Sequence, residues 1–449
     1  MEWNEEQTAV LHYPGKYLRI YGGPAAGKSL LISALANEYS KREKGGVYIL
    51  CRSRDETDRM TQRMYRLAGN TPVNIETFRS FADRIAGGLR AIITPFQERL
   101  ILTDILSAIP EGHYLYPAGK SYQLSEELAD FLRIIRLNYI TPDILPSQGD
   151  ELTIGLKRIY TELEDKIRTA NLMTEPQLMK FAADHAPDDV KAILVDEAQD
   201  LELPAYEFIR KIGGRGASIV LAGDLYQNIH RYQGADPDFL REKFPIDFPL
   251  ARTIHLKRSY RAGSLRISTA NKMFGSGFEQ FRPEPHNGNE ELYLHDFHDP
   301  QHEALGIAGL IEMLIRRNGY APEDIAVILR SPRRGSAGLR RALQLRNIQV
   351  NGGEAPFLTP SAWDLIKSAS ACDNSEDILL KLPSFLSDII EKHHSSEIML
   401  EPLSGLRKLF EEAAAVMPHW KSYKIAAAVK EEFLRQPFRR EKGGVSIMS

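Results

Sequence analysis

A glycine-rich loop between a short apolar run and a helical pattern constrains this fold more than any other segment. Residues 22–29 read G-G-P-A-A-G-K-S, which fits the pattern G-x-x-x-x-G-K-[S/T] in full. A β-rich run at 17–21 precedes the loop, and a helical pattern extends from Lys28 to about residue 41. Glycines allow successive backbone N–H groups to face one phosphate, and the start of a helix adds positive charge. The pattern predicts a nucleotide-binding loop; the alternative, a chance glycine-rich turn, leaves the flanking strand and helix unexplained.

Two side chains of this loop carry the expected chemistry. Lys28 can place its charge on the β- and γ-phosphate oxygens, and Ser29 can hold Mg²⁺. The predicted phosphate-binding residues are Gly22, Gly23, Pro24, Ala25, Ala26, Gly27, Lys28 and Ser29.

An acidic pair ends an apolar strand later in the chain, where residues 192–197 read A-I-L-V-D-E. If this strand lies beside the phosphate loop in a parallel sheet, its carboxyl end meets the nucleotide. Asp196 would then hold Mg²⁺, and Glu197 would orient or deprotonate the attacking water. The alternative is a structural pair that caps the next helix.

Strands alternate with helices in the first part of the chain, which indicates a parallel sheet with right-handed crossovers. Besides the two segments above, strands are expected at 47–50, 73–75, 218–221 and 253–256, with a helix at 78–86. From about 92 to 175, apolar residues recur at helical spacing without a strand run, which predicts a helical insertion.

A second α/β block is expected after a Pro/Gly-rich connection at 275–288. Its strands are expected at 291–294, 325–329 and 348–350, its helices at 300–317 and 339–345, and a helical region at 363–435. Within it, the histidine-rich run 295–302 resembles a metal cluster. We favour a structural interpretation, in which Asp299 caps a helix that starts at Pro300.

The composition excludes several classes of protein. The 57 Lys+Arg against 60 Asp+Glu give a net charge of −3, so any anion-binding surface must be a local patch. Two cysteines cannot build a disulfide framework or a four-thiolate zinc site, and they fit a reducing compartment. No apolar run reaches the roughly 20 residues of a membrane helix. We expect a soluble cytoplasmic protein without membrane contacts.

Several motifs together resemble one known family. Residues 196–200, D-E-A-Q-D, are similar to the D-E-x-Q-D of superfamily 1 DNA helicases of the UvrD/Rep/PcrA type. Other family motifs occur in the family's order. They are N-E-E-Q at 4–7, T-F-R-S-F at 77–81, G-D-L-Y-Q-N-I-H-R-Y-Q-G-A at 223–235, L-K-R-S-Y-R at 256–261 and I-A-V-I-L-R at 325–330.

This resemblance implies an α/β fold with two RecA-like P-loop NTPase lobes, each a parallel sheet flanked by helices. The first lobe would comprise 1–90 and 177–275, with a helical insertion at 91–176. The second, incomplete lobe would comprise 276–449, with a reduced helical accessory region at about 360–436. The implied activity is ATP-dependent helicase or translocase action, 3′ to 5′, on single-stranded DNA or DNA with a single-stranded tail.

The resemblance also assigns roles to residues. Gln7 and Tyr260 would hold adenine, Gln227 and Arg261 would contact the γ-phosphate, and Tyr232 would stack on a base. The implied catalytic set is Lys28, Ser29, Asp196, Glu197, Gln227 and Arg261, and the implied DNA-binding set is Arg52, Thr77, Phe78, Arg79, His230 and Tyr232.

The sequence departs from the family mainly on the DNA side. Arg52 replaces the aromatic residue of T-F-T-N, Arg79 replaces the histidine of T-F-H-S-F, and Gln233 replaces the arginine of F-R-G-A. His230 stands where tyrosine is usual. The DNA face therefore differs, whereas the nucleotide face is nearly intact.

The last residues, 443–449, resemble the V-x-L-M-T that opens the next family motif, whose continuation is absent from this sequence. We therefore expect a fragment that binds ATP and Mg²⁺ but hydrolyses ATP weakly. Compact relatives that partner nucleases suggest a nuclease partner by analogy. The alternative function is an ATP-gated DNA-binding or scaffold subunit without motor activity; an RNA-directed relative is a third possibility.

Overall fold

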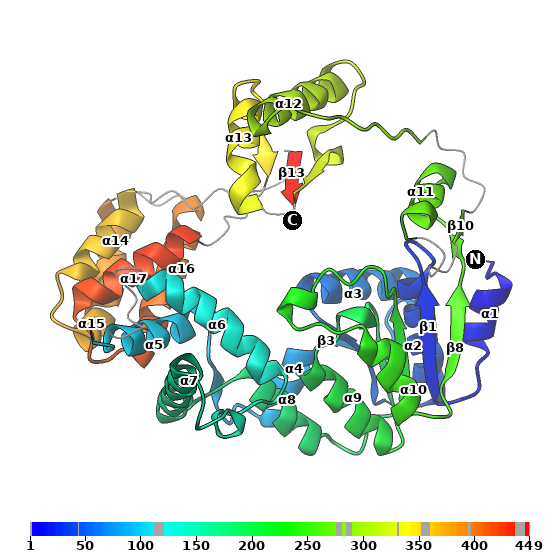
Figure 1. Cartoon of the computed structure of the whole chain (residues 1–449), viewed down its shortest axis with the longest axis horizontal. Helices are drawn as coiled ribbons and strands as arrows, with labels where there is room; N and C mark the ends of the chain where they lie inside the picture. Colours follow the sequence, from blue (N-terminus) through cyan, green and yellow to red (C-terminus); the bar gives the residue numbers. More distant parts are fainter. Residues whose placement is uncertain are drawn as a thin grey trace. The chain divides into compact units, whose positions relative to one another are not determined.

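The computed structural model describes residues 2–43, 45–110, 121–274, 281–283, 290–329, 332–351, 360–392, 397–435 and 445–448. The chain divides into two compact units, Met1–Leu292 and Tyr293–Ser449, whose elements are drawn in Figure 1. Most of the predicted connection (275–280 and 284–289), together with Arg330, 443–444 and Ser449 of the family motifs, lies outside the described residues. Within the described ranges, no helix is both long enough and apolar enough to cross a bilayer.

A six-stranded parallel sheet forms the centre of the first unit, in the order β3-β2-β6-β7-β1-β8. Its strands are β1 (Tyr17–Gly22), β2 (Val47–Cys51), β3 (Asn74–Thr77), β6 (Ala192–Val195), β7 (Ser218–Gly223) and β8 (Arg252–Leu256). This confirms the predicted α/β fold of a RecA-like P-loop lobe. The acidic strand β6 does not adjoin β1, because β7 lies between them.

The sheet is buried on both faces, as a parallel sheet requires. On β2, Tyr48 and Leu50 belong to one apolar core, and Val47 and Ile49 belong to the other. Helices α4 (Phe78–Ala86), α8 (Glu175–Asp184), α9 (Leu203–Gly214) and α10 (Phe244–Asp247) contribute to the first core. Helices α1 (Glu5–Leu11), α2 (Lys28–Arg42) and α3 (Arg54–Ala68) contribute to the second. The two cores make a three-layer lobe.

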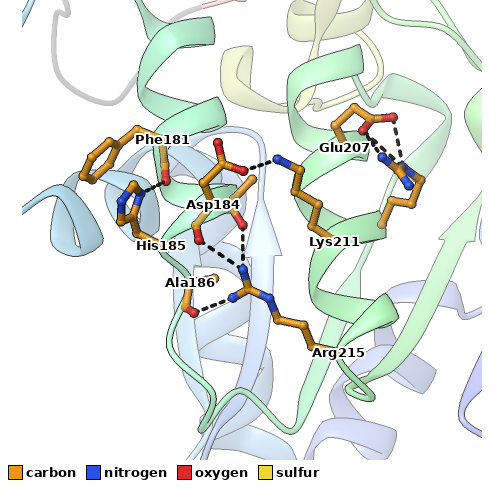
Figure 2. Close-up of polar contacts among 9 residues, drawn as sticks. Phe181, Asp184, His185, Ala186, Glu207, Lys211 and Arg215 are labelled. Carbon is orange, nitrogen blue, oxygen red and sulfur yellow. Dashed lines mark hydrogen bonds and ion pairs between the residues drawn. The ribbon is translucent and has the colours of Figure 1, made fainter.

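Polar contacts fasten α8 to the helix beside it, α9 (Figure 2). Lys211 of α9 pairs with Asp184, the last residue of α8. The guanidinium of Arg215 donates to the carbonyl oxygens of Asp184 at 3.1 Å and Ala186 at 2.6 Å, so it satisfies carbonyls at the end of α8. The opposite ends of both helices line the cavity described below, so these contacts help to fix its wall.

Three long helices lie between residues 91 and 173: α5 (Pro95–Ser107), α6 (Ser121–Leu137) and α7 (Glu151–Thr169). The buried guanidinium of Arg136 on α6 binds Glu98 of α5 and Glu164 of α7, which joins all three. The expectation of no strand here was wrong in detail. The two-residue strands β4 (Ala91–Ile92) and β5 (Leu172–Met173) pair in parallel, and such short strands give no periodic signal.

Short strands and further helices complete the two units. In the first unit, β9 (Arg258–Ser259) pairs with β10 (Arg282–Pro283), near α11 (Ser264–Phe274). In the second, β11 (Ala326–Ile328), β12 (Val350–Asn351) and β13 (Val445–Met448) form a parallel sheet with β13 in the middle. Its helices are α12 (Pro300–Arg316), α13 (Pro332–Gln344), α14 (Pro360–Ser370), α15 (Ser375–Lys392), α16 (Glu397–Val416) and α17 (Ser422–Arg435).

Two predictions about the start of the second unit have different outcomes. The strand expected at 291–294 was wrong, because these residues do not form a strand and Leu294 is 99% exposed. An apolar alternation alone does not make a strand. The capping prediction is confirmed: Asp299 accepts hydrogen bonds from the backbone of Gln301 and His302, and α12 starts at Pro300.

Candidate nucleotide site and nucleic-acid face

The glycine-rich loop has the strained backbone that its sequence predicts. Ala25 has a φ of 57° and Gly27 a φ of 90°, and α2 begins directly afterwards. Lys28 is only 6% exposed, and its ammonium donates to the carbonyl oxygens of Gly22 at 2.8 Å and Gly23 at 3.2 Å. The loop therefore curls around the lysine head group at the start of the helix.

Residues outside the loop donate hydrogen bonds to three successive carbonyl groups of the loop. The hydroxyl of Ser259 donates to Pro24 O at 2.8 Å, and the backbone N–H of Tyr260 donates to Ala25 O at 3.0 Å. The amide of Gln7 donates to Ala26 O at 3.4 Å. Within the loop, the backbone N–H of Ala26 donates to Gly23 O at 3.3 Å, so the loop's shape is fixed both by its own backbone and by its neighbours.

Gln7 and Tyr260, the two predicted adenine-binding residues, lie together beside this loop. The Tyr260 hydroxyl donates to Gln7 Oε1 at 3.5 Å and accepts a hydrogen bond from the Asn4 amide at 2.7 Å. Asn4 and Gln7 also form a capping box at the start of α1. The structure thus brings the two residues together, while their contact with adenine stays a prediction.

Phe281 is a residue of this site that the sequence did not indicate. A Cβ atom at Gly23 would lie 2.6 Å from Phe281 Cζ, so the ring covers this part of the loop. Asn271 holds Phe281 through both of its backbone polar groups, at 3.0 and 3.2 Å. Position 281 lies outside every motif, so only its packing against Gly23 identifies it.

Asp196 lies at the phosphate loop although its strand is not next to β1. Burial and the neighbouring Glu197 raise the pKa of Asp196 to about 6, against a hydrogen bond from Ser29 and the charge of Lys28. The loop and the acidic pair therefore meet in one site, as predicted.

A chain of hydrogen bonds leads from the acidic pair to Gln227. Gln199, in the turn η2 (Ala198–Asp200), donates to Glu197 Oε2 at 2.9 Å and accepts from the backbone N–H of Asp224 at 2.9 Å. The Asp224 carboxylate then accepts a hydrogen bond from the Gln227 amide at 2.7 Å. Gln199 and Asp224 belong to the quoted motifs, but their roles were missed. The position of Asp224 directly after the central strand β7 is the signal that could have identified it.

The donor set at Asp196 fits Mg²⁺. The Ser29 hydroxyl and the Asp196 carboxylate are oxygen donors, and Mg²⁺ is usually bound by one or two carboxylates together with substrate phosphates. Burial and the neighbouring Glu197 raise the pKa of Asp196 although Ser29 and Lys28 lower it. A divalent cation would supply further positive charge.

The predicted DNA-binding residues of the T-F-R-S-F motif have different environments. The Thr77 hydroxyl is the cap of α4 and accepts from the Ser80 backbone N–H at 2.9 Å. Phe78 packs partly against the first core. Arg79 extends to the surface, 3.9 Å from Asp83. Thr77 therefore has a structural task, and Arg79 is the residue most available to a ligand.

The substituted residues Arg52 and Gln233 contact each other directly. The Arg52 guanidinium donates to Gln233 Oε1, and the Gln233 amide donates to the Tyr232 hydroxyl at 2.9 Å. Tyr232 is 75% exposed in the short helix η3 (Arg231–Gln233). Burial and the charge of Arg52 lower the pKa of His230. Two departures from the family pattern, 181 positions apart, are therefore one local arrangement.

A cavity of about 200 Å³ connects the acidic pair with this face. Its lining includes Arg52, Phe78 and Arg79 on one side and Asp196 and Glu197 on the other. The other predicted γ-phosphate residue, Arg261, is exposed.

Comparisons with known proteins agree with this geometry. A family model described as an AAA domain matches residues 6–233, just over half of the chain. "ATP-dependent DNA helicase UvrD1" of Mycobacterium leprae is 25% identical over 419 residues, covering 83% of this chain and 53% of the relative. "Probable DNA helicase II homolog" of Rickettsia conorii is 22% identical over 360 residues (73% and 53%). "ATP-dependent DNA helicase Rep" of Salmonella typhimurium is 25% identical over 194 residues (42% and 28%). The chain spans about half the length of the first two relatives.

Proposed function

This chain belongs to the AAA domain family, and from that premise we propose that it is a UvrD/Rep-like ATP-dependent helicase or translocase on single-stranded DNA. The observation that carries the proposal is the chain of contacts from the phosphate loop to Gln227. It links Asp196, beside Ser29, through Glu197, Gln199 and Asp224. Such a chain couples the place of hydrolysis to the segment that carries Tyr232.

Each residue of the nucleotide site has a proposed task. The N–H groups of the loop and Lys28 bind the β- and γ-phosphates, and Gln7 and Tyr260 orient adenine. Ser29 and Asp196 would hold Mg²⁺, which when bound would supply positive charge to the phosphates. Glu197 accepts the proton of the attacking water, and Gln227 senses the γ-phosphate.

The nucleic-acid face is proposed to hold one strand without reading its sequence. Tyr232 offers a ring for stacking, and Arg52 and Arg79 offer charge for phosphates. The other proposed contacts are Thr77, Phe78 and His230. We also propose 3′ to 5′ movement, DNA with a single-stranded tail as substrate, and a nuclease as a partner, all by family analogy.

An ATP-gated DNA-binding or scaffold subunit is the second candidate function. The observation that favours it is the altered nucleic-acid face, where Arg52 and Gln233 satisfy each other. In this alternative, nucleotide binding changes DNA affinity, and hydrolysis by the chain is weak.

A comparison of Lys28→Ala with Lys41→Ala tests both functions. Both residues lie on α2, but Lys41 is exposed and pairs only with neighbouring Glu38. We expect Lys28→Ala to lower ATP hydrolysis at least ~100-fold, as loss of a charge-stabilising donor does, and Lys41→Ala to match the wild type. ATP-dependent movement on DNA by the wild type supports the motor. ATP-sensitive DNA binding without movement supports the scaffold, and a wild type that binds no ATP contradicts both.

A further inference from the structure

The helical insertion reaches the nucleic-acid face through one arginine. Arg133 on α6 donates from Nη1 to the carbonyl oxygen of Gln233 at 2.8 Å and from Nη2 to Glu202 Oε1 at 2.8 Å. Glu202 precedes α9 in the central lobe, and burial raises its pKa against the charge of Arg133. The guanidinium therefore connects the insertion, the lobe and the loop that carries Tyr232.

Apolar packing accompanies this contact. Gly234 ends η3 with a φ of 99°, and a Cβ atom there would lie 2.5 Å from Leu137 Cδ1 and 3.6 Å from Ile134 Cδ1, both on α6. The loop thus turns directly against the helix, where only glycine fits in both conformation and space.

The same helix is also fastened to the rest of the insertion. Arg136, one turn after Arg133, is buried between Glu98 of α5 and Glu164 of α7. The segment from Gln227 to Gly234 is consequently anchored at both ends. Gln227 is tied to the acidic pair through Asp224, and Gln233 is tied to the insertion through Arg133.

We infer that Arg133 is a positioning residue, through which the helical insertion sets the pose of Tyr232 and hence the affinity for single-stranded nucleic acid. This inference rests on the proposed function. Arg133 acts through the Gln233 carbonyl and need not touch the nucleic acid. Charge on the guanidinium strengthens its hydrogen bond to the neutral carbonyl, and Glu202 fixes its direction.

The test compares Arg133→Met with Arg158→Met in the 449-residue chain. Arg158 lies on α7 of the same insertion and is exposed, so both variants remove one positive charge. Fluorescence anisotropy with a labelled oligothymidylate measures affinity at several salt concentrations, and a fluorescent ATP analogue measures nucleotide affinity. We expect Arg133→Met to weaken oligonucleotide binding about tenfold, the scale of one charge-assisted hydrogen bond. Arg158→Met should stay within about twofold of the wild type.

The salt dependence separates positioning from direct contact. An arginine that binds a phosphate contributes a slope of about −0.7 per contact on single strands, whereas a positioning residue contributes none. We expect the slope and the nucleotide affinity of Arg133→Met to equal the wild-type values, and Arg133→Lys to recover part of the affinity. Gly234→Ala, which disturbs the same contact from the loop side, should also weaken binding.

Three outcomes would overturn the inference: equal affinities of the two methionine variants, a slope reduced by about 0.7 in Arg133→Met, or a parallel loss of nucleotide affinity. The first two contradict positioning, and the third indicates a general loss of structure. A wild type that binds no oligonucleotide contradicts the proposed function itself, which the affinity of the unmodified chain decides separately.

Discussion

The proposed nucleotide site and the proposed nucleic-acid face of the first unit are built in contrasting ways. At the nucleotide site, Gln7, Lys28 and Asp224 are almost fully buried; Gln7 and Lys28 donate to backbone carbonyls, and Asp224 accepts from the Gln227 amide. On the nucleic-acid face, Tyr232 and Arg79 reach far into solvent. The side chains of the first site are therefore held by the protein, whereas those of the second are exposed to solvent.

This difference explains where the sequence departs from its family. A triphosphate demands N–H groups and oxygen donors at set positions, so few residue types satisfy the nucleotide site. Sequence-tolerant strand binding needs only stacking surfaces and positive charge. Arg52 and Gln233 can therefore differ from the family pattern and still form a satisfied contact.

Glu197→Gln should cause the largest change, a loss of ATP hydrolysis. It should affect the nucleotide site and leave the nucleic-acid face unchanged. The amide keeps the shape of the side chain but cannot accept a proton, so we expect hydrolysis to fall by ~10²–10⁴-fold. Affinity for ATP and for single-stranded DNA should change little. Steady-state phosphate release and equilibrium binding measure the two properties in the same preparation.

Glu207→Gln is the matched control for that change. Glu207 lies on α9 of the same unit and pairs with Arg210 at the surface (Figure 2). Its replacement removes the same charge from the lobe without touching the site. Equal losses in the two variants would mean that net charge, and not proton transfer, governs hydrolysis.

The phosphate loop and the acidic pair were predictable because each is a local pattern with one geometric consequence. The strand before Gly22 and the helix after Gly27 follow from residue spacing alone. The proximity of Asp196 to Ser29 was also predictable, because the carboxyl ends of parallel strands lie at the same edge of a sheet. The strand between them was not predictable, because sheet order depends on pairing between distant segments and not on the periodicity of any one of them.

A pH series on Mg²⁺-dependent nucleotide binding tests the buried site, with a smaller expected change than that of Glu197→Gln. Because the pKa of Asp196 is about 6 and its ordinary value is 3.8, protons compete with Mg²⁺ well above the usual carboxylate range. We expect affinity to fall up to about tenfold per pH unit below pH 6, since metal ligands must be deprotonated. Nucleotide binding measured in excess chelator should not show this fall in affinity below pH 6.

Two variants test whether Asp196 causes this pH dependence of Mg²⁺-dependent nucleotide binding. Asp196→Asn should have weak, pH-independent Mg²⁺ affinity. Asp200→Asn should still show the fall in affinity below pH 6, although burial also raises the pKa of Asp200 to about 6.

In the free protein, the folded state holds the Asp196 proton more tightly than the unfolded state. The free energy of unfolding should therefore decrease as pH rises from about 4 to 6, and Asp196→Asn should raise the Tm at pH 7. A lower Tm for this variant would contradict the raised pKa of Asp196.

The nucleic-acid face shows where sequence reasoning ends. Arg52 and Gln233 were recognised as departures one at a time, and nothing in the sequence joined them. Phe281 and Arg133 lie outside the motifs altogether, and each acts by filling space or by binding a backbone carbonyl. Backbone partners leave no residue-type signature, so such roles become visible only when the chain is folded.

A double-mutant cycle on Arg52 and Gln233 should give the smallest changes in binding. It tests whether the nucleotide site and the nucleic-acid face are separate sites. We expect Arg52→Met and Gln233→Met each to weaken single-strand binding about three- to tenfold, and the double variant to lose less than the product of the two. Only Arg52→Met should reduce the salt slope, by about 0.7, because only an arginine can neutralise a phosphate. Nucleotide affinity should be unchanged in all three variants. If it falls, the cavity beside Glu197 transmits the change and the two faces are one coupled site; multiplicative losses on DNA would instead mean that the Arg52–Gln233 contact has no role in binding.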